Sequence, residues 1–271
     1  MPEFSTLAIV LHETKAEASD MAGPLLDLAA ERGLRASVLA PGDAVPEGSD
    51  VVVGVGGDGT LLEAVALAYP LDLPVIGVNL GTVGYLTDVE PGEIAPMLDA
   101  LATGAVHELH RMTLTVRLED GRAFHGINEV VLEKARSQRL VQIEVDINQR
   151  RFTTYRSDGL IVATPLGSTA YSLSAGGPVL DPGLEAIILT PVAPHSLLSR
   201  SIVLAPDTEL SFRISIDRDV RINVDGREMA MAGVGEVVSV GRGERPVRFL
   251  SMSGGLPFPQ GVRRQFGLDH A

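Results

Sequence analysis

The ten residues 51–60, VVVGVGGDGT, restrict the fold of this chain more than any other stretch of its sequence. The apolar run Val51–Val55 predicts a short strand that is buried on both faces, and residues 60–69 predict a helix. A glycine turn over 56–59 separates the two. A strand, a glycine turn and a helix N-terminus aim backbone N–H groups and a helix dipole at one point, and such a point favours phosphate.

The turn also contains Asp58, although a carboxylate in a pure phosphate cradle would repel its ligand. A carboxylate at this place suits a base that accepts a proton from an attacking hydroxyl, or a ligand of a divalent cation. The sequence therefore indicates a phosphotransferase. The alternative is purely structural, because glycine turns follow strands in many α/β proteins and Asp often begins a helix.

Two other phosphate-binding motifs do not fit. A Walker loop needs Gly-Lys-Ser/Thr, yet the two lysines of the chain, Lys15 and Lys134, lie far from any glycine-rich loop in the sequence. Gly54, Gly56 and Gly59 match the dinucleotide spacing G-x-G-x-x-G, but residues 74–79, PVIGVN, bring no carboxylate to the end of the next strand. Hydride transfer is therefore disfavoured.

Composition limits the classes of protein further. The chain has 271 residues, of which 45% are apolar, so it can bury the core of one large domain or two modest ones. It has no cysteine, which excludes disulfides and thiolate metal sites and fits a reducing compartment, so we expect a cytoplasmic protein. No apolar stretch has the length of a membrane span, and the N-terminal residues predict a strand rather than a signal peptide.

The charge balance bears on the partners. There are 22 basic against 35 acidic residues, net −13, which disfavours a nucleic-acid surface. An acidic protein that binds phosphates must offset charge locally, and we expect loop amides, a few arginines and Mg²⁺ to do so. The six histidines show no metal-ligand spacing, and no metal site made of protein ligands is predicted.

The periodicity of the chain changes near residue 110. Before it, the pattern predicts strands over 7–11, 36–39, 51–55 and 75–78 and helices over 15–32, 60–69 and 91–103, the signature of an α/β domain with a parallel sheet. After it, segments 112–118, 141–147, 210–216 and 220–224 alternate with period two, which predicts antiparallel strands. We expect domains over 1–110 and 111–250, and 251–271, with a short helix over 262–266, could return to the first domain.

Two polar segments stand out in the β-rich part. A strand over 127–132 begins with Asn128-Glu129, whose amide and carboxylate suit an adenine edge and a ribose diol, or simply a solvated strand end. Residues 164–177, TPLGSTAYSLSAGG, combine six hydroxyl side chains with four glycines or prolines beside the turn Arg156-Ser-Asp-Gly159. A nucleotide contact surface explains this density, whereas a structural interpretation makes Ser168 a helix cap.

The order and spacing of these segments resemble the NAD kinase family from the first strand to about residue 240. They comprise GGDGT at 56–60, NLGTVGYL at 79–86, Asn128-Glu129, RSDG at 156–159 and GSTAYSLSAGG at 167–177. GGDGT alone also occurs in diacylglycerol and sphingosine kinases and in related phosphofructokinases. Segment 167–177 together with Asn128-Glu129 is far more specific.

The resemblance implies phosphorylation of the 2′-hydroxyl on the adenosine ribose of NAD, giving NADP, with ATP or polyphosphate as donor and Mg²⁺ as cofactor. It implies an α/β phosphate-donor domain, a β-rich domain for NAD binding and oligomerisation, and a homodimer or homotetramer. Either NAD or NADH fits as acceptor. Two alternatives remain open: a lipid or small-alcohol kinase with the same GGDGT loop, and a catalytically silent dinucleotide sensor.

The resemblance also assigns roles to residues. Asp58 is implied as the proton acceptor, Asp158 as the holder of a ribose hydroxyl and Tyr171 as a ring facing a base. The complete implied set is Asp58, Gly59, Asn128, Glu129, Arg139, Arg156, Asp158, Leu166, Thr169, Ala170, Tyr171, Ser172, Leu173, Ser174 and Arg227. The chain departs from the common pattern at Leu166 (usually Thr), Val83 (Leu), Tyr85 (Phe) and Arg227 (Gln), and Arg227 could add a cation near a phosphate.

Overall fold

The computed structural model describes residues 3–80, 87, 89–136, 139–215, 218–255 and 258–268, apart from the side chains at 259, 264 and 265. The chain divides into two compact units, residues 1–110 with 247–271, and residues 111–246. The sequence placed the second limit at residue 250. The structure has it at 246, because Val247–Ser251 forms a strand of the first unit and pairs with Val75–Asn79.

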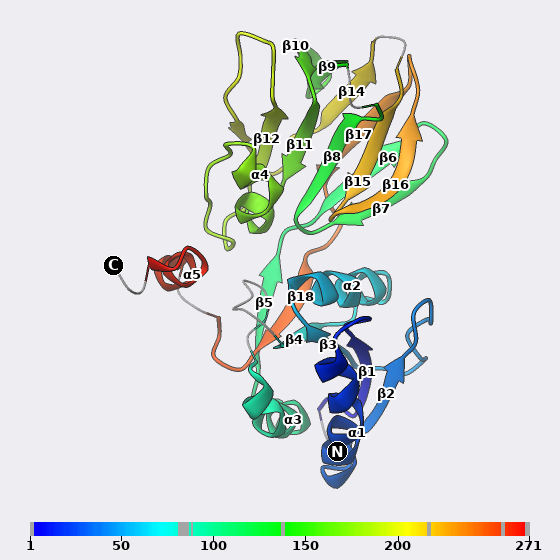
Figure 1. Ribbon diagram of the computed structural model, residues 1–271, viewed down its shortest axis with the longest axis vertical. Helices are drawn as coiled ribbons and strands as arrows, with labels where there is room; N and C mark the ends of the chain where they lie inside the picture. Colours follow the sequence, from blue (N-terminus) through cyan, green and yellow to red (C-terminus); the bar gives the residue numbers. More distant parts are fainter. Residues whose placement is uncertain are drawn as a thin grey trace. The chain divides into compact units, whose positions relative to one another are not determined.

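The first unit has a six-stranded sheet in the order β2-β1-β3-β4-β18-β5 (Figure 1). Its strands are β1 Thr6–Leu11, β2 Arg35–Leu39, β3 Val51–Gly56, β4 Val75–Asn79, β5 His107–Arg111 and β18 Val247–Ser251. Its helices are α1 Ala16–Glu31, α2 Asp58–Ala68, α3 Ile94–Thr103 and α5 Phe258–Gln265, with 3-10 turns at Tyr69–Leu71 and Pro91–Glu93. The pairs β1–β2, β1–β3, β3–β4 and β4–β18 are parallel, which confirms the predicted α/β class.

Helices cover both faces of this sheet. Side chains from α1 and α3, such as Leu25 and Leu98, share one core cluster with alternate residues of the central strands. Helix α2 packs on glycines: a Cβ at Gly54 or Gly77 would lie within 3.3 Å of Leu61. Gly54 therefore serves close helix packing, which accounts for part of the G-x-G-x-x-G match without a ligand.

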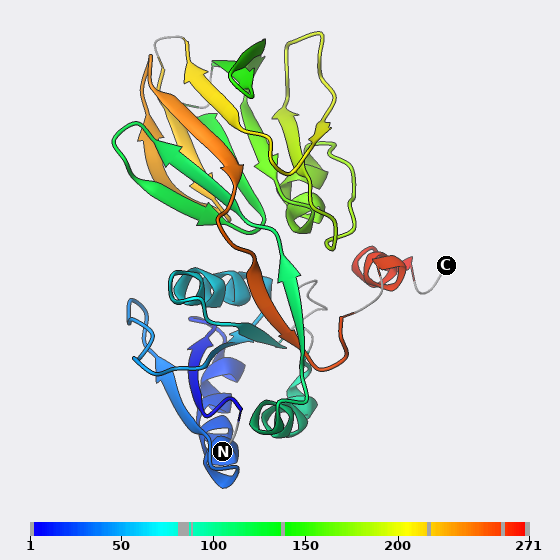
Figure 2. The same ribbon diagram turned by 180° about the vertical axis from the view of Figure 1, so that it is seen from behind.

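The second unit consists of two six-stranded sheets whose strand pairs are antiparallel, as predicted (Figure 2). One sheet has the order β10-β9-β14-β17-β6-β7, from Arg150–Ser157, Val141–Ile147, Leu210–Ile214, Val237–Arg242, Leu114–Leu118 and Ala123–Gly126. The other has the order β13-β12-β11-β8-β15-β16, from Ile202–Leu204, Ile187–Val192, Gly159–Ala163, Glu129–Lys134, Val220–Val224 and Arg227–Ala232. One core cluster draws on both sheets, including Tyr155, Phe212 and Leu132.

A short helical segment covers the outer face of the β11 sheet. A 3-10 turn at Leu166–Thr169 leads into α4, Tyr171–Ser174 (Figure 1). A smaller apolar cluster around Ile161 packs against Ala175, the residue that follows α4. Strand β11 pairs with β8 so that Ala163 lies opposite Glu129. This register brings the polar segment 164–177 beside Asn128-Glu129, although the two are far apart in the sequence.

Some predicted boundaries are wrong. Helix α2 begins at Asp58 instead of residue 60, because a carboxylate in the first turn interacts favourably with the helix dipole. The helix expected over 91–103 is a 3-10 turn with a Glu90–Glu93 capping box, followed by α3. The last helix spans Phe258–Gln265 instead of 262–266. Within the described residues, no helix has the length and apolar character needed to span a membrane.

Candidate functional site

In the first unit, the glycine turn lies where the carboxyl ends of three parallel strands meet. β1 pairs with β2 on one side and β3 on the other, so the chain leaves the sheet in opposite directions from β1 and from β3. The His12 N–H donates to Val55 O, and the Leu80 N–H donates to Gly56 O, which holds the loops after β1, β3 and β4 together. Ligands of open α/β sheets bind at such a topological switch point.

A pocket of about 370 Å³ lies at this switch point. Its lining comes from the loop after β1 and from the first turn and a half of α2: His12, Glu13, Thr14, Lys15, Gly57, Gly59, Thr60 and Glu63. Lys15 Nζ donates to Leu80 O at 2.9 Å. Lys15 lies far from the glycine turn in the sequence, but β1–β3 pairing brings it to the turn in space.

The turn itself requires glycine at one position and leaves room at two others. A Cβ at Gly56 would lie 2.2 Å from Thr60 Oγ1, whereas Gly57 and Gly59 face open space. Asp58 is the first residue of α2 and is half-buried. A phosphate can thus approach the backbone of the turn with a carboxylate at its side.

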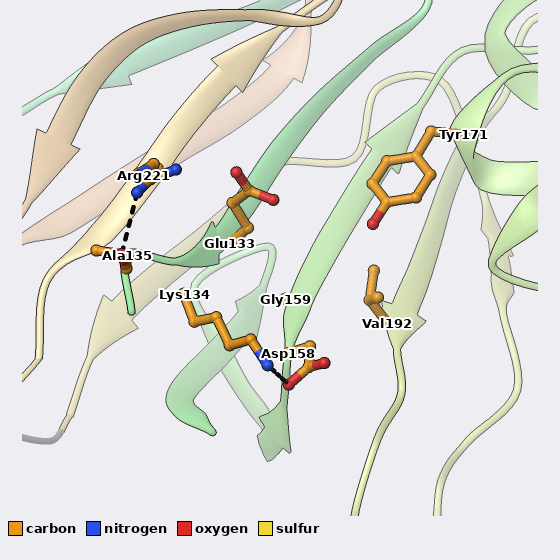
Figure 3. A pocket seen from close by; sticks show the side chains of 8 residues that line it. All are labelled: Glu133, Lys134, Ala135, Asp158, Gly159, Tyr171, Val192 and Arg221. Carbon is orange, nitrogen blue, oxygen red and sulfur yellow. Dashed lines mark hydrogen bonds and ion pairs between the residues drawn. The ribbon is translucent and has the colours of Figure 1, made fainter. Parts of the chain in front are cut away.

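The second unit has its own pocket, of about 280 Å³, next to α4 (Figure 3). It is lined by Glu133, Lys134, Ala135, Asp158, Gly159, Tyr171, Val192 and Arg221. Lys134 Nζ lies 2.5 Å from Asp158 Oδ1, and Arg221 donates to Ala135 O at 3.0 Å. The pocket therefore contains both signs of charge, and the remaining lysine of the chain is part of it.

Tyr171, the first residue of α4, lines this pocket. Its ring points into the pocket and lies opposite Glu133, with the hydroxyl directed toward Val192 (Figure 3). The side chain is 41% exposed, which leaves a ring face available to a base. Burial and the carboxylates of Glu133 and Asp158 raise the pKa of its hydroxyl, so the neutral phenol is the form present.

Asn128 and Glu129 lie at the start of β8, and Glu129 is only 6% exposed. Burial, the charge of Asp225 and a hydrogen bond from the Tyr171 backbone together set the pKa of Glu129 at about 7, well above its ordinary value. Glu129 Oε2 has no hydrogen-bond partner within the described part of the chain. An unpaired carboxyl oxygen in such surroundings suits a ligand hydroxyl.

The segment 166–174 is only partly accessible. Leu166 and Ser172 are buried, and Ser172 Oγ lies 3.0 Å from Thr190 Oγ1. Thr169, Ala170 and Leu173 are half-buried, and Ser174 is exposed. Ser168 does not cap a helix, which was the structural alternative, because its Oγ accepts the Leu180 N–H at 3.0 Å and ties the segment to the following loop.

The remaining expected residues lie elsewhere. Arg139, Arg156 and Arg227 are exposed and line neither of these two pockets. Arg227 begins β16, and its positive charge lowers the pKa of Asp225, which burial raises. Val83 and Tyr85 fall outside the described residues. Within the described part of the chain, no three His, Asp or Glu side chains form a group that could hold a metal ion.

The structure thus adds Lys15, Lys134, Arg221 and Asp225 to the sites. Strand pairing brings each of them to its place, and local sequence gives little sign of it. One signal in the sequence was the small number of lysines: the chain has only two, and each lines one of these two pockets. For Asp225 the signal was its place before Gly226, which predicts a tight hairpin.

Two family models match the chain. The ATP-NAD kinase N-terminal domain matches residues 40–106, and the ATP-NAD kinase C-terminal domain matches residues 127–252. An NAD kinase of Geotalea daltonii is 36% identical over 232 residues, which cover 84% of this chain and 82% of the relative. An NAD kinase of Legionella pneumophila (strain Corby) is 40% identical over 230 residues, 83% of this chain and 78% of the relative.

Solved structures agree in fold. A yeast NADH kinase complexed with NADH has a TM-score of 0.88 at 24% identity, covering 100% of this chain and 89% of that one. An NAD kinase from Archaeoglobus fulgidus in complex with ATP has a TM-score of 0.76 at 23% identity, covering 97% of each chain. At these sequence identities the solved structures show the fold alone, whereas the family models and the curated relatives show the family. By that evidence the chain belongs to the NAD kinase family of phosphotransferases.

Proposed function

We propose that this protein transfers the γ-phosphoryl group of ATP to the 2′-hydroxyl of the adenosine ribose of NAD and so forms NADP. The observation that carries the proposal is the position of Asp58, at the first residue of α2 beside a pocket at the switch point of a parallel sheet. Membership of the NAD kinase family supplies the pair of substrates.

In the proposed reaction the ribose O2′ attacks the γ-phosphorus, the bond from that phosphorus to the bridging oxygen breaks, and ADP leaves. The hydroxyl proton passes to Asp58. Because a ribose hydroxyl is a very weak acid, the proton moves late, as the new phosphorus–oxygen bond forms. The main contributions of the protein are then positioning and neutralisation of charge.

The donor is proposed to bind at the first-unit pocket. The turn amides and Lys15 support phosphate binding, and the open space at Gly57 and Gly59 allows close approach. Mg²⁺ bound through substrate phosphates needs only one or two protein carboxylates, and Glu63 is a suitable residue to hold it. The cation would offset charge on the triphosphate.

NAD is proposed to bind to the second unit. The support is the exposed Tyr171 ring, the Asp158 carboxylate in the same pocket and the unpaired Oε2 of Glu129. A lipid or small-alcohol kinase would need an apolar acceptor channel, whereas half of the residues that line this pocket are charged. A silent sensor would gain nothing from a carboxylate at position 58.

We also propose a homodimer or homotetramer. Exposed apolar side chains lie at both edges of the β11 sheet, Val203 on β13 and Met229 and Met231 on β16. Edge strands with apolar side chains favour association with another chain. Size-exclusion chromatography with light scattering gives the number of subunits, and a monomer would contradict this part.

The function is tested by incubating the purified protein with ATP, MgCl₂ and NAD and reading NADP with an NADP-specific dehydrogenase. Parallel reactions replace ATP by polyphosphate and NAD by NADH, because the family resemblance leaves both choices open. Asp58→Asn is included for comparison, with much slower formation of NADP expected. Absence of NADP with NAD as acceptor, and of NADPH with NADH as acceptor, in every combination would contradict the proposal.

A further inference from the structure

Asp225 and Gly226 form the two-residue turn of the β15–β16 hairpin. Val224 pairs with Arg227, and both turn residues have positive φ, 48° at Asp225 and 79° at Gly226. Asp-Gly is a favoured pair for a type I′ turn, so turn formation alone would account for an aspartate at this position. Such a role requires no contact between its carboxylate and another part of the chain.

The carboxylate nevertheless binds three consecutive backbone N–H groups nearly 100 residues earlier in the chain. Ile127 N–H donates to Oδ2 at 2.8 Å, and Asn128 and Glu129 N–H donate to Oδ1 at 2.8 and 3.1 Å. The Asp225 N–H returns a bond to Glu129 O at 3.1 Å. The hairpin turn therefore clamps the backbone of the proposed NAD-binding pair.

The same backbone is held from its other side. Thr164 N–H donates to Asn128 O at 2.9 Å, and Thr164 Oγ1 donates to Ile127 O at 2.6 Å. Gly167 packs so closely that a Cβ there would lie 2.1 Å from Asn128 O. With N–H and C=O groups engaged on both sides, the freedom that remains at Asn128 is in its half-buried side chain.

We propose that Asp225 is a positioning residue for the acceptor nucleotide, which fixes the backbone of Ile127–Glu129 so that Asn128 and Glu129 present their side chains to NAD. The proposal rests on the proposed function only for the identity of the ligand. The clamp itself is a property of the chain without ligand and can be measured separately.

The arrangement also has an electrostatic consequence. The negative charge of Asp225 raises the pKa of Glu129, after burial as the larger cause, while the Tyr171 backbone N–H lowers it. Burial raises the pKa of Asp225 itself, which its three backbone donors and Arg227 oppose. Burial, the charge of Asp225 and the backbone N–H of Tyr171 therefore set the protonation of Glu129.

The test variant is Asp225→Asn. Asparagine tolerates positive φ and forms the same turn, so the hairpin is expected to fold. Its amide offers one acceptor oxygen in place of two and directs an NH₂ group at backbone donors. We expect the KM for NAD to rise about tenfold to a hundredfold, the order of loss from small misplacement of a binding group, with the KM for ATP within about twofold.

Asp50→Asn is the matched control. Asp50 Oδ2 accepts the backbone N–H groups of Ser5 and Thr6 at 2.8 and 2.9 Å, so it is also a carboxylate that clamps a strand start, but in the first unit. We expect a loss of thermal stability without a change in the KM for NAD. Equal changes in the KM for NAD from both variants would overturn the proposal.

Two further readouts separate positioning from general loss of structure. Hydrogen exchange at the amides of Ile127, Asn128 and Glu129 should be at least about tenfold faster in Asp225→Asn than in the native chain, whether or not the protein makes NADP. The inflection near neutral pH in the KM for NAD should move to lower pH, because the charge that raises the pKa of Glu129 is lost.

The outcomes are distinct. Unchanged exchange at the three amides would overturn the clamp, and a KM for NAD within about twofold of the native value in a folded Asp225→Asn would overturn its positioning role; either result leaves NAD phosphorylation intact. If the native protein makes no NADP but exchange at the three amides is faster in Asp225→Asn, the function is overturned and the clamp remains.

Discussion

Lys134 and Asp158 form an ion pair in the second-unit pocket, with Nζ 2.5 Å from Oδ1. Both side chains are only partly exposed, 23% and 34%, so solvent screens the pair less than a surface pair. Lys134 engages one carboxylate oxygen, which leaves the other for a ribose hydroxyl. The pair is thus suited to hold Asp158 in place before the acceptor arrives.

Removing Asp158 should therefore impair acceptor binding. We expect Asp158→Ala to raise the KM for NAD about tenfold or more. The change removes the carboxylate that is proposed to accept a hydrogen bond from a ribose hydroxyl, and it leaves Lys134 without its partner. Lys134→Met should raise it by a smaller factor. Steady-state kinetics with varied NAD provide the measurement.

The matched control is Glu185→Ala, which breaks the more exposed Arg242–Glu185 ion pair of the same unit. That variant should leave the KM for NAD unchanged. If Asp158→Ala behaves like Glu185→Ala, Asp158 has no contact with the acceptor.

Asp58→Asn tests the proposed base. Loss of a general base lowers kcat by a factor on the order of 10²–10⁴, and we expect a decrease in this range with a much smaller change in NAD affinity. Single-turnover kinetics and calorimetric titration with NAD distinguish the two effects. Asp27→Asn, on the exposed side of α1, is the control. Near-native turnover would remove Asp58 from the mechanism.

Lys15 provides a test of the donor site. It contributes positive charge to a pocket that also contains Glu13 and Glu63, so its loss leaves phosphates next to carboxylates. We expect Lys15→Met to raise the KM for ATP about tenfold, with little effect on the KM for NAD. Lys15→Arg keeps the charge and should retain most of the affinity. An unchanged KM for ATP in Lys15→Met would mean that Lys15 does not contact the donor and that its role is the hydrogen bond to Leu80 O.

The extent to which the sequence predicted these sites follows from how local each feature is. The turn at Gly56–Gly59 and its helix are contiguous, so strand, turn and helix could be recognised together. Lys15 reaches the same pocket through β1–β3 pairing, and Asp225 reaches Asn128 through a hairpin turn almost 100 residues later, so neither contact has a local pattern. Strand periodicity predicts which face of a sheet is buried, but it does not predict which strands become neighbours.

Ser168 illustrates a different limit. A hydroxyl before a helix often caps it, and this was the structural alternative to a nucleotide contact at Ser168. The structure directs this hydroxyl to the Leu180 backbone instead, because the helix that follows has only four residues and begins after Ala170. A side chain with several possible partners is assigned correctly only when the tertiary contacts are known.

Tyr171 tests whether a ring face contacts a base. Stacking on an aromatic side chain contributes roughly 1–3 kcal/mol per base, so Tyr171→Ala should weaken NAD binding by about this amount. Tyr171→Phe keeps the ring and should bind NAD nearly as well as the native protein. Calorimetric titration measures both. Equal affinity of the alanine variant, in a protein that remains folded, would show that the ring makes no contact with NAD.

The raised pKa of Glu129 predicts how the stability of the folded protein depends on pH. Its folded-state pKa of about 7 lies above the unfolded value of 4.5, so the folded protein binds this proton more tightly than the unfolded chain does. The contribution of protonated Glu129 to the stability of the folded state is therefore complete below pH 4.5 and is lost as the pH rises through 7. The shift corresponds to a free energy on the order of 3 kcal/mol.

Glu129→Gln carries no titrating proton at this position. The unfolding free energy of the native protein, measured relative to this variant by urea denaturation, should fall between pH 4.5 and 7.5 and then level off. A difference that stays constant over this range would mean that Glu129 titrates near its ordinary value. Burial and the negative charge of Asp225 would then not raise the pKa of Glu129, although the Glu129 N–H donates to Asp225 Oδ1.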